Sequence, residues 1–282
     1  MAIVTFCGDG NKETGNTASV IATAAYMSIK HNMKILLIST NFNEDTVKEC
    51  FWVEKKTKTV LPNGKTANVS AIQSGIEGLS RMISSSKIEP RIIKDYTRVI
   101  LKDRFDVLLG YNGVRTQYKE IQRIYPQVIA VSSKYYDMVI VDLDRKLDKD
   151  VKEEIIKISD IKVITTNQRI KDIQSVVEKL QNNEVTNKKD VLMVMGKYDN
   201  NLKFNAKNVT RSILRQRKII NTVPYNGKFF EAMQEGTIID LFLDLLRLKN
   251  KKDPNYFFLQ EIDRLTESIN EKWEEVRMKR GI

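Results

Sequence analysis

A glycine-rich segment near the start of the chain, residues 8–17, holds the residues best suited to chemistry, and we call it the glycine loop. Gly10, Gly15 and Thr17 have the G-x4-G-x-T spacing of a phosphate-binding loop, in which Asn16 stands where lysine is usual. Glycines let backbone N–H groups turn toward phosphate oxygens, and the first turn of the following helix adds positive potential. The spacing therefore predicts that the glycine loop binds phosphate groups.

Two side chains at the end of the glycine loop limit the chemistry that it can perform. Thr17 can place its hydroxyl on Mg²⁺. Asn16 can donate a hydrogen bond, but it lacks the charge with which a lysine stabilises the transition state of phosphoryl transfer. Taken alone, the segment is equally compatible with a glycine-rich strand-to-helix turn whose N-cap is Asn16 or Thr17.

Short apolar runs that precede helical segments are expected to position this loop. The expected strands cover residues 3–7, 34–39, 105–109, 138–143, 161–166, 191–195 and 219–224. Most of these runs lack the polar alternation of a half-exposed strand, so they predict strands buried on both faces. Alternating β and α elements predict an α/β fold, a three-layer sandwich with a mostly parallel central sheet.

The helical segments between these strands complete the expected organisation. The expected helices cover residues 17–31, 116–135, 150–159, 168–182, 205–215, 228–247 and 255–280, with two more within 70–100. Residues 54–65 are charged and end in a Pro-Asn-Gly turn signal, so we expect a surface loop or a short hairpin there. No internal repeat or domain boundary is visible. We therefore expect one domain, residues 1–282, with a C-terminal helical extension at about 253–282.

Composition excludes several classes of protein. The 282 residues are 41% hydrophobic and 29% charged, which suits a packed core and excludes disordered and collagen-like chains. No apolar run approaches the roughly 20 residues of a membrane span, and no basic segment precedes the first apolar run. Two cysteines and one histidine exclude a disulfide framework and a Cys/His zinc site. We expect a cytoplasmic protein, whose net charge of +11 is compatible with an anionic partner.

The order of elements and several short motifs resemble the MinD/ParA family of deviant Walker-A ATPases, above all its TadZ-like branch. Residues 136–142 (YDMVIVD) resemble the Walker-B strand, and residues 194–199 (VMGKYD) resemble V-x-N-R-x-D. Residues 223–226 (VPYN) resemble the I-P-Y-D segment of the base pocket, and residues 229–236 before an apolar helix match the family's ending. The resemblance covers nearly the whole chain.

This resemblance implies a P-loop NTPase fold that binds ATP and Mg²⁺ and forms a homodimer across the nucleotides. The implied nucleotide-binding residues are Gly10, Asn11, Lys12, Glu13, Thr14, Gly15, Asn16, Thr17, Ala18, Pro224 and Tyr225. The implied metal ligands are Thr17 and Asp142.

Key positions of the family pattern are changed. Asn11 and Asn16 replace its two lysines, Ser39 replaces the water-supporting aspartate, and Gly196 replaces the adenine-reading asparagine. Loss of charge at Asn16 removes transition-state stabilisation, so we expect ATP binding with weak or no hydrolysis. We assign no catalytic residue. Lys12 lies one residue after the position of the first family lysine. A further hypothesis is that its side chain swings inward and replaces a missing lysine.

A basic segment precedes the last expected strand. Residues 207, 211 and 215 are basic and share one face of an expected helix, an arrangement that invites a compensating anion. The candidate anion or DNA contacts are Lys203, Lys207, Arg211, Arg215, Arg217 and Lys218. A solvated face on a basic protein is the alternative. DNA is favoured only by analogy with ParA proteins, and binding would be nonspecific.

The last expected helix has a narrow apolar stripe of helical period. Its glutamates at 267, 271, 274 and 275 would face an anionic membrane unfavourably. We therefore expect this helix to pack on the domain or a partner, without membrane contact.

Together these observations predict a cytoplasmic positioning or assembly factor in which ATP serves as a dimerisation switch. Its expected partner is a protein of a pilus, secretion or partition apparatus. Two alternatives stay open: a DNA-dependent ParA-type partition ATPase, and a nucleotide-free interaction scaffold, that is, a pseudo-ATPase.

Overall fold

A sheet of eight strands runs through the computed structural model of the chain, which describes residues 1–43, 46–52, 75–83, 89–181, 191–211 and 220–281. The order is β3-β4-β2-β5-β1-β6-β7-β8, and neighbours are parallel except for the antiparallel pair β3 and β4. The strands are β1 (Ala2–Gly8), β2 (Ile35–Ser39), β3 (Arg98–Leu101), β4 (Phe105–Leu108), β5 (Met138–Leu143), β6 (Ile161–Thr166), β7 (Val191–Tyr198) and β8 (Asn221–Pro224). The predicted α/β fold with a mostly parallel central sheet is confirmed.

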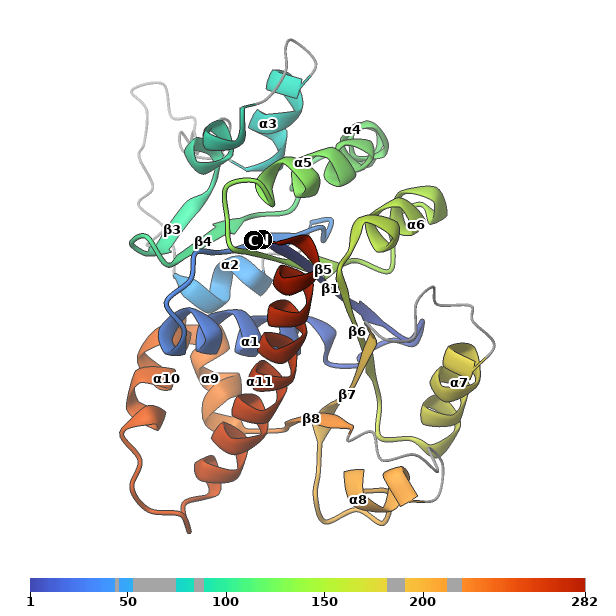
Figure 1. Cartoon of the computed structure of the whole chain (residues 1–282), viewed down its shortest axis with the longest axis vertical. Helices are drawn as coiled ribbons and strands as arrows, with labels where there is room; N and C mark the ends of the chain where they lie inside the picture. The colour runs from blue at the N-terminus through green and yellow to red at the C-terminus, as the bar shows by residue number, and fades with distance from the viewer. Residues whose placement is uncertain (44–45, 53–74, 84–88, 182–190, 212–219, 282) are drawn as a thin grey trace, which may run out of the picture.

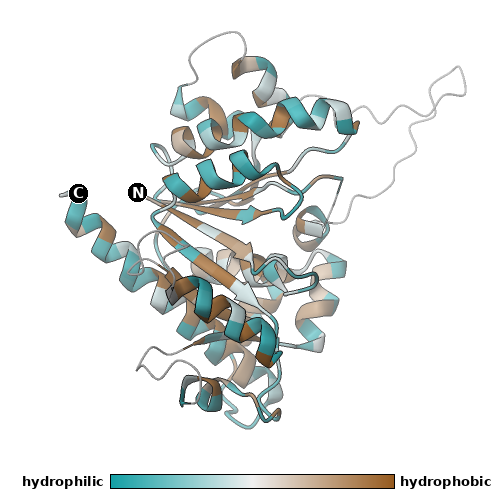
Figure 2. Cartoon of the chain, turned by 90° about the vertical axis from the view of Figure 1, so that its right-hand side faces the viewer, coloured by the Kyte–Doolittle hydropathy of each residue, from teal (hydrophilic) through white to brown (hydrophobic). Residues whose placement is uncertain are grey.

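The central strands are mostly apolar, and both of their faces are covered. In β2, Ile35 and Leu37 belong to one buried cluster, whereas Leu36 and Ile38 belong to another. Successive side chains of a strand point to opposite faces, so one strand contributes to two cores. Figure 2 shows apolar residues concentrated in the strands, with polar residues on the outer helices.

Two layers of helices cover the sheet (Figure 1). One layer contains α1, α2, α9, α10 and α11, and the other contains α3, α4, α5 and α6. A third cluster packs α7 and α8 on β6 and β7. The α-helices are α1 (Asn16–Lys30), α2 (Thr46–Phe51), α3 (Ile76–Ile83), α4 (Arg115–Ile121), α5 (Tyr125–Ser132), α6 (Lys149–Ile158), α7 (Ile170–Gln181), α8 (Ala206–Val209), α9 (Gly227–Glu235), α10 (Ile238–Leu246) and α11 (Pro254–Arg280). Two 3-10 helices, η1 (Pro90–Tyr96) and η2 (Gln122–Ile124), complete the described elements.

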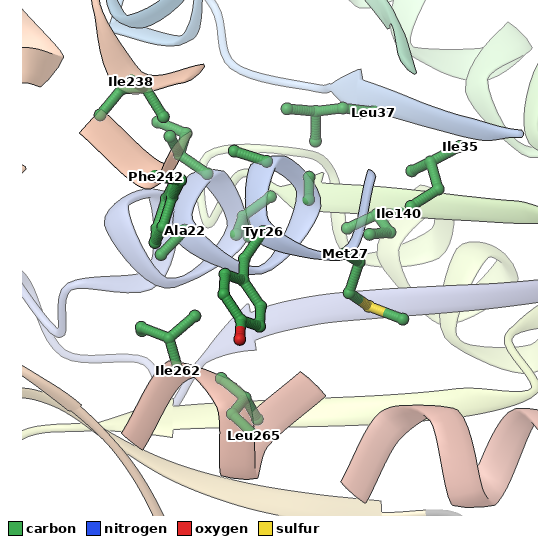
Figure 3. Packing of buried hydrophobic residues seen from close by; sticks show 14 of the residues in the cluster. Ala22, Tyr26, Met27, Ile35, Leu37, Ile140, Ile238, Phe242, Ile262 and Leu265 are labelled. Carbon is green, nitrogen blue, oxygen red and sulfur yellow. The ribbon is translucent and has the colours of Figure 1, made fainter. Parts of the chain in front are cut away.

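An aromatic group joins the helices of the first layer. The fully buried ring of Phe242 lies 5.6 Å from the ring of Tyr26 and 6.1 Å from those of Phe229 and Phe258, measured between centroids. These residues come from α10, α1, α9 and α11, and Figure 3 shows Phe242 next to Ala22 and Tyr26 of α1. One side chain of α10 therefore links the C-terminal helices to the helix that follows the glycine loop.

The long helix α11 packs on the body of the fold, as predicted. Ile262, Leu265 and Ile269 are fully buried, and Asp263 accepts hydrogen bonds from Tyr26 and Lys30 of α1. None of the helices in the described ranges combines the length and the apolar character that crossing a bilayer requires.

Some expected boundaries are wrong. Residues 98–100, expected to be helical, belong to β3, which forms a hairpin with β4 because Asp103 adopts a left-handed turn conformation (φ 59°). The single helix expected over 228–247 is two helices, separated at Gly236 (φ 72°). A Cβ at Gly236 would lie 3.0 Å from the backbone of Trp52, so glycine is required there. The helix expected over 116–135 is divided into α4, η2 and α5.

Two expected segments cannot be compared in full. The loop expected at 54–65 lies outside the described residues, and so do residues 212–219 of the basic segment. Of the helix expected over 205–215, α8 covers Ala206–Val209.

Candidate functional site

The glycine loop connects β1 to α1 through a series of tight turns. Gly10 (φ 104°), Glu13 (φ 61°) and Gly15 (φ 78°) all have left-handed backbone conformations, which glycine adopts without steric cost. Gly15 is the residue immediately before α1, and its carbonyl accepts the N–H of Ser19 at 2.9 Å. The loop therefore turns sharply before the first helical turn, as the predicted phosphate-binding loop requires.

Neighbouring strands hold both halves of the glycine loop in place. The N–H of Asp9 donates to the carbonyl of Thr165 at 3.0 Å, and the Thr166 hydroxyl donates to the Asp9 carboxylate at 2.7 Å. In the second half, Thr14 is buried and its carbonyl lies against Gly196 of β7, where an added Cβ would be 2.1 Å from that oxygen. The loop is therefore seated on the ends of β6 and β7.

A cavity of about 310 Å³ opens where this loop meets the ends of β2 and β5. Its lining consists of Gly8, Gly10, Asn11, Glu13, Thr14, Gly15, Asn16, Thr17, Asn41, Asp142, Leu143, Asp144, Arg145 and Lys146. The structure thus brings together the predicted loop residues and Asp142, except for Lys12 and Ala18. Pro224 and Tyr225 do not line the cavity, and the Tyr225 side chain is 67% exposed.

Asp142 is the buried centre of the cavity's hydrogen bonds. The Asn16 amide donates to its Oδ1 at 2.8 Å, while the Thr17 hydroxyl and the Asn41 amide donate to Oδ2 at 2.9 and 2.8 Å. The carboxylate is 1% exposed. Burial raises the pKa of Asp142 from its usual 3.8 to about 6, because the three hydrogen bonds to the charged form only partly offset the loss of water.

The oxygen atoms at this position suit a magnesium ion that is shared with phosphates. The Thr17 hydroxyl and the Asp142 carboxylate adjoin each other, and the buried Oδ1 of Asn16 has no hydrogen-bond partner. Among the described residues, no group of three or more His, Cys, Asp or Glu side chains could hold a metal ion by itself. Mg²⁺ commonly binds through one or two carboxylates together with substrate phosphates, so Thr17 and Asp142 fit this role.

Comparison of the fold, and not of the sequence, shows similarity to known proteins. No protein-family model matches the chain, and no curated protein matches it either. Among solved structures, a ParA family ATPase from Chlorobium tepidum TLS matches with a TM-score of 0.63 and 13% sequence identity, over 93% of this chain and 96% of that chain. The chain has the MinD/ParA ATPase fold.

Two other proteins with the MinD/ParA fold were solved with a nucleotide. The septum site-determining protein MinD from Pyrococcus horikoshii OT3, complexed with Mg-ADP, matches with a TM-score of 0.61 and 12% identity, over 96% of this chain and 98% of that chain. A putative plasmid partition protein from Borrelia burgdorferi B31, bound to AMPPNP, matches with a TM-score of 0.58 and 15% identity, over 93% and 97%. The architecture expected from the MinD/ParA resemblance is confirmed.

Within the MinD/ParA fold, Gly196 occupies a crowded position. Besides the Thr14 carbonyl, an added Cβ would lie 3.2 Å from the Thr165 methyl group. The next residue, Lys197, has a left-handed conformation (φ 49°) and packs against Gly15. The glycine at the family's asparagine position therefore lets β7 support the glycine loop.

Sequence reasoning did not assign several residues that line the cavity. Asn41 lies two residues after Ser39, the last residue of β2, and its amide donates to the Asp142 carboxylate. Asp144, Arg145 and Lys146 follow β5 directly. Their position in the sequence, directly after an expected strand, could have indicated them. Ligands bind outside the carboxyl ends of parallel strands in open α/β sheets such as this one.

The basic segment is separate from the residues that line this cavity. Lys203, Lys207 and Arg211 lie in and around α8, and all three are exposed. Arg215, Arg217 and Lys218 lie outside the described residues. The structure therefore places three of the six candidate anion or DNA contacts at the surface.

The raised pKa of Asp142 gives a testable dependence of stability on pH. A carboxyl group whose pKa is higher in the folded state binds more protons there, so its contribution to stability falls as pH rises from about 4 to about 6. Asp142→Asn removes this titration. We expect the unfolding free energy of the variant, relative to the wild type, to rise by about 2 kcal/mol across that interval.

Urea unfolding at several pH values, in chelator-containing buffer without nucleotide, measures this difference. Asp137→Asn is the comparison variant, because it removes a carboxylate at the start of β5 that bonds to the Lys34 N–H, away from the cavity. A parallel pH dependence of the wild type and Asp142→Asn would show that Asp142 has no raised pKa.

Proposed function

We propose that the chain is a MinD/ParA-type positioning or assembly factor that binds ATP with Mg²⁺ and hydrolyses it weakly or not at all. The observation that carries this proposal is the contact between Asn16 and Asp142. The residue at the lysine position is a neutral amide whose N–H group is bonded to a carboxylate, so it supplies no charge for phosphoryl transfer. The cavity and the turns of the glycine loop, by contrast, support binding.

The relatives support the choice of ATP and Mg²⁺ as cofactors. The Borrelia burgdorferi partition protein was solved with AMPPNP and the Pyrococcus horikoshii MinD with Mg-ADP. In this chain, we propose that nucleotide is bound by the loop from Gly10 to Ala18 and by Pro224 and Tyr225. Thr17 and Asp142 would hold Mg²⁺, which when bound neutralises phosphate charge.

The proposed cellular role follows the same relatives, which are a septum site-determining protein and a plasmid partition protein. We propose that residues 1–282 act as one cytoplasmic domain with a helical extension at about 253–282, and that ATP favours a homodimer. The TadZ-like branch, whose members help to place a pilus or secretion apparatus, is our preferred assignment. Its partner would then be a protein of such an apparatus.

A charge-restoring variant tests the proposal. We expect saturating ATP with Mg²⁺ to raise the melting temperature of the wild type, because a ligand that binds only the folded state stabilises it. Asn16→Lys is expected to bind ATP about fivefold more tightly, because a charged hydrogen bond contributes roughly 1 kcal/mol more than a neutral one. Thermal melting and calorimetric titration measure both effects.

Asn16→Gln is the matched control, since it keeps a neutral amide at the same position. We expect it to bind ATP no more tightly than the wild type. Equal affinity of the lysine variant and the wild type would contradict the role given to the missing charge. If ATP leaves the melting temperature of the wild type unchanged, the nucleotide-free scaffold is the correct function.

The exposed basic residues Lys203, Lys207 and Arg211 favour one alternative, a DNA-dependent ParA-type partition ATPase. Phosphate contacts by such residues make binding strongly dependent on salt. An ATPase assay with and without duplex DNA separates the two functions. Hydrolysis that DNA stimulates and that high salt suppresses would favour the partition ATPase over a hydrolysis-deficient assembly factor.

A further inference from the structure

The turn that follows β5 is fixed firmly at the edge of the cavity. The Asp144 N–H donates to the Thr40 hydroxyl at 2.7 Å, and that hydroxyl donates to the Asp142 carbonyl at 2.9 Å. The Asp144 carboxylate accepts the Lys146 N–H at 3.0 Å, and the next side chain, Leu147, is buried. The backbone of residues 144–147 is therefore tied to β2 and β5 by hydrogen bonds within the protein.

This turn carries the cations that line the cavity. Arg145 and Lys146 both contribute to the lining and are both exposed to solvent. The glycine loop lines the same cavity but contributes no cation to it, because its one basic residue, Lys12, is exposed and lies outside the lining.

The other charges that line the cavity are negative, so the binding of an anion there requires these two cations. The other ionisable side chains of the lining are the carboxyl groups of Glu13, Asp142 and Asp144. Glu13 lies 4.0 Å from the Lys197 ammonium group, but that lysine is not part of the lining. Without Arg145 and Lys146, the only ionisable side chains that line the cavity around a phosphate chain would be acidic.

We infer that Arg145 and Lys146 replace the missing lysines of the glycine loop and bind the phosphate oxygens of a polyphosphate or nucleoside triphosphate. This inference rests on the proposed function, because it concerns the same cavity. The positive charge approaches the phosphates from the end of β5 and not from the loop itself. Arg145 can offer a forked pair of N–H donors to two oxygens, whereas Lys146 acts as a point charge.

Calorimetric titration of the full chain with tripolyphosphate, and separately with ATP and Mg²⁺, tests the inference. We expect Arg145→Gln and Lys146→Gln each to weaken binding of both probes by about tenfold or more, since each removes a charge-assisted hydrogen bond. The double variant is expected to lose more than either single variant. Glutamine keeps much of the stem and removes the charge, and both positions are exposed, so the fold is expected to be retained.

Lys149→Gln is the matched control, because it removes a cation from the exposed first turn of α6, outside the cavity lining. It should bind both probes as the wild type does. Melting temperatures of all variants without ligand verify that they are folded.

The outcomes separate this inference from the proposed function. If ATP binds equally to the wild type and the Arg145 and Lys146 variants, the inference is wrong and ATP binding stands. A loss confined to Lys12→Ala would also overturn the inference, in favour of an inward-swinging lysine. If tripolyphosphate binds through Arg145 and Lys146 but ATP does not bind, the inference stands and the proposed nucleotide function is wrong. Failure of the wild type to bind either probe overturns both.

Discussion

Gly196→Ala is expected to destabilise the protein by about 3 kcal/mol, at the upper end of the usual cost of overpacking. The added Cβ would lie 2.1 Å from the Thr14 carbonyl oxygen, well inside van der Waals contact. The oxygen belongs to the backbone and the position of the Cβ is fixed by the backbone of residue 196, so no side-chain rotation can relieve the clash. The glycine loop must move away from β7 or the strand must bend. Urea unfolding should show the loss of stability, and titration with ATP and Mg²⁺ should show weaker binding.

Gly227→Ala is the matched control for this variant. Gly227 begins α9, and a Cβ there would meet no atom within 4 Å. Alanine in a helix is more favourable than glycine by roughly 0.5–1 kcal/mol, so this variant should be as stable as the wild type or more stable. If Gly196→Ala matched it in stability and affinity, β7 could not be the support of the glycine loop.

Phe242→Ala is expected to cost about 3–5 kcal/mol, the range measured for removing a large aromatic side chain from a core. Its ring is fully buried and packs against Tyr26, Phe229 and Phe258. The truncation leaves a cavity between α1, α9 and α11, and helices on all sides lose contacts at once. Denaturant unfolding measures the change in the unfolding free energy.

Leu243→Ala removes a similar apolar side chain from the next position of α10, where the leucine is 39% exposed. We expect a change within about 0.5 kcal/mol, as is usual for surface substitutions. Comparable losses from the two substitutions would mean that Phe242 does not link these helices. Because α1 begins at the glycine loop, Phe242→Ala should also lower the melting temperature that is measured with ATP present.

The sequence indicated the architecture because strands that are buried on both faces appear in it as continuous apolar runs. The run Ile35–Ser39 is apolar at every position but its last, and it forms a central strand with helices on each side. Residues 98–101 do not form such a continuous apolar run. This strand is short, lies at the edge of the sheet and is partly exposed, so its polar neighbours made it look like the end of a helix.

The candidate site was predictable only in part. The spacing of Gly10, Gly15 and Thr17 indicated the loop, and the position of Asp142 after a buried strand indicated its neighbour. Arg145 and Lys146 belong to no motif, and only the fold shows that they line the same cavity as the loop. Hydrogen bonds such as that between Asn41 and Asp142 join residues 101 positions apart, and no local pattern encodes them.

Because the glycine loop rests on β7, the site can form only after β7 has folded against the loop. Thr14 and Gly15 meet Gly196 and Lys197, which lie about 180 residues further along the chain. A nascent polypeptide that had emerged only as far as α7 would contain the whole loop, Asp142 and Arg145, but not the strand against which that loop rests. We expect such an intermediate to be unable to bind a phosphate ligand. The protein would then bind anions only late in its folding, after β7 has been synthesised.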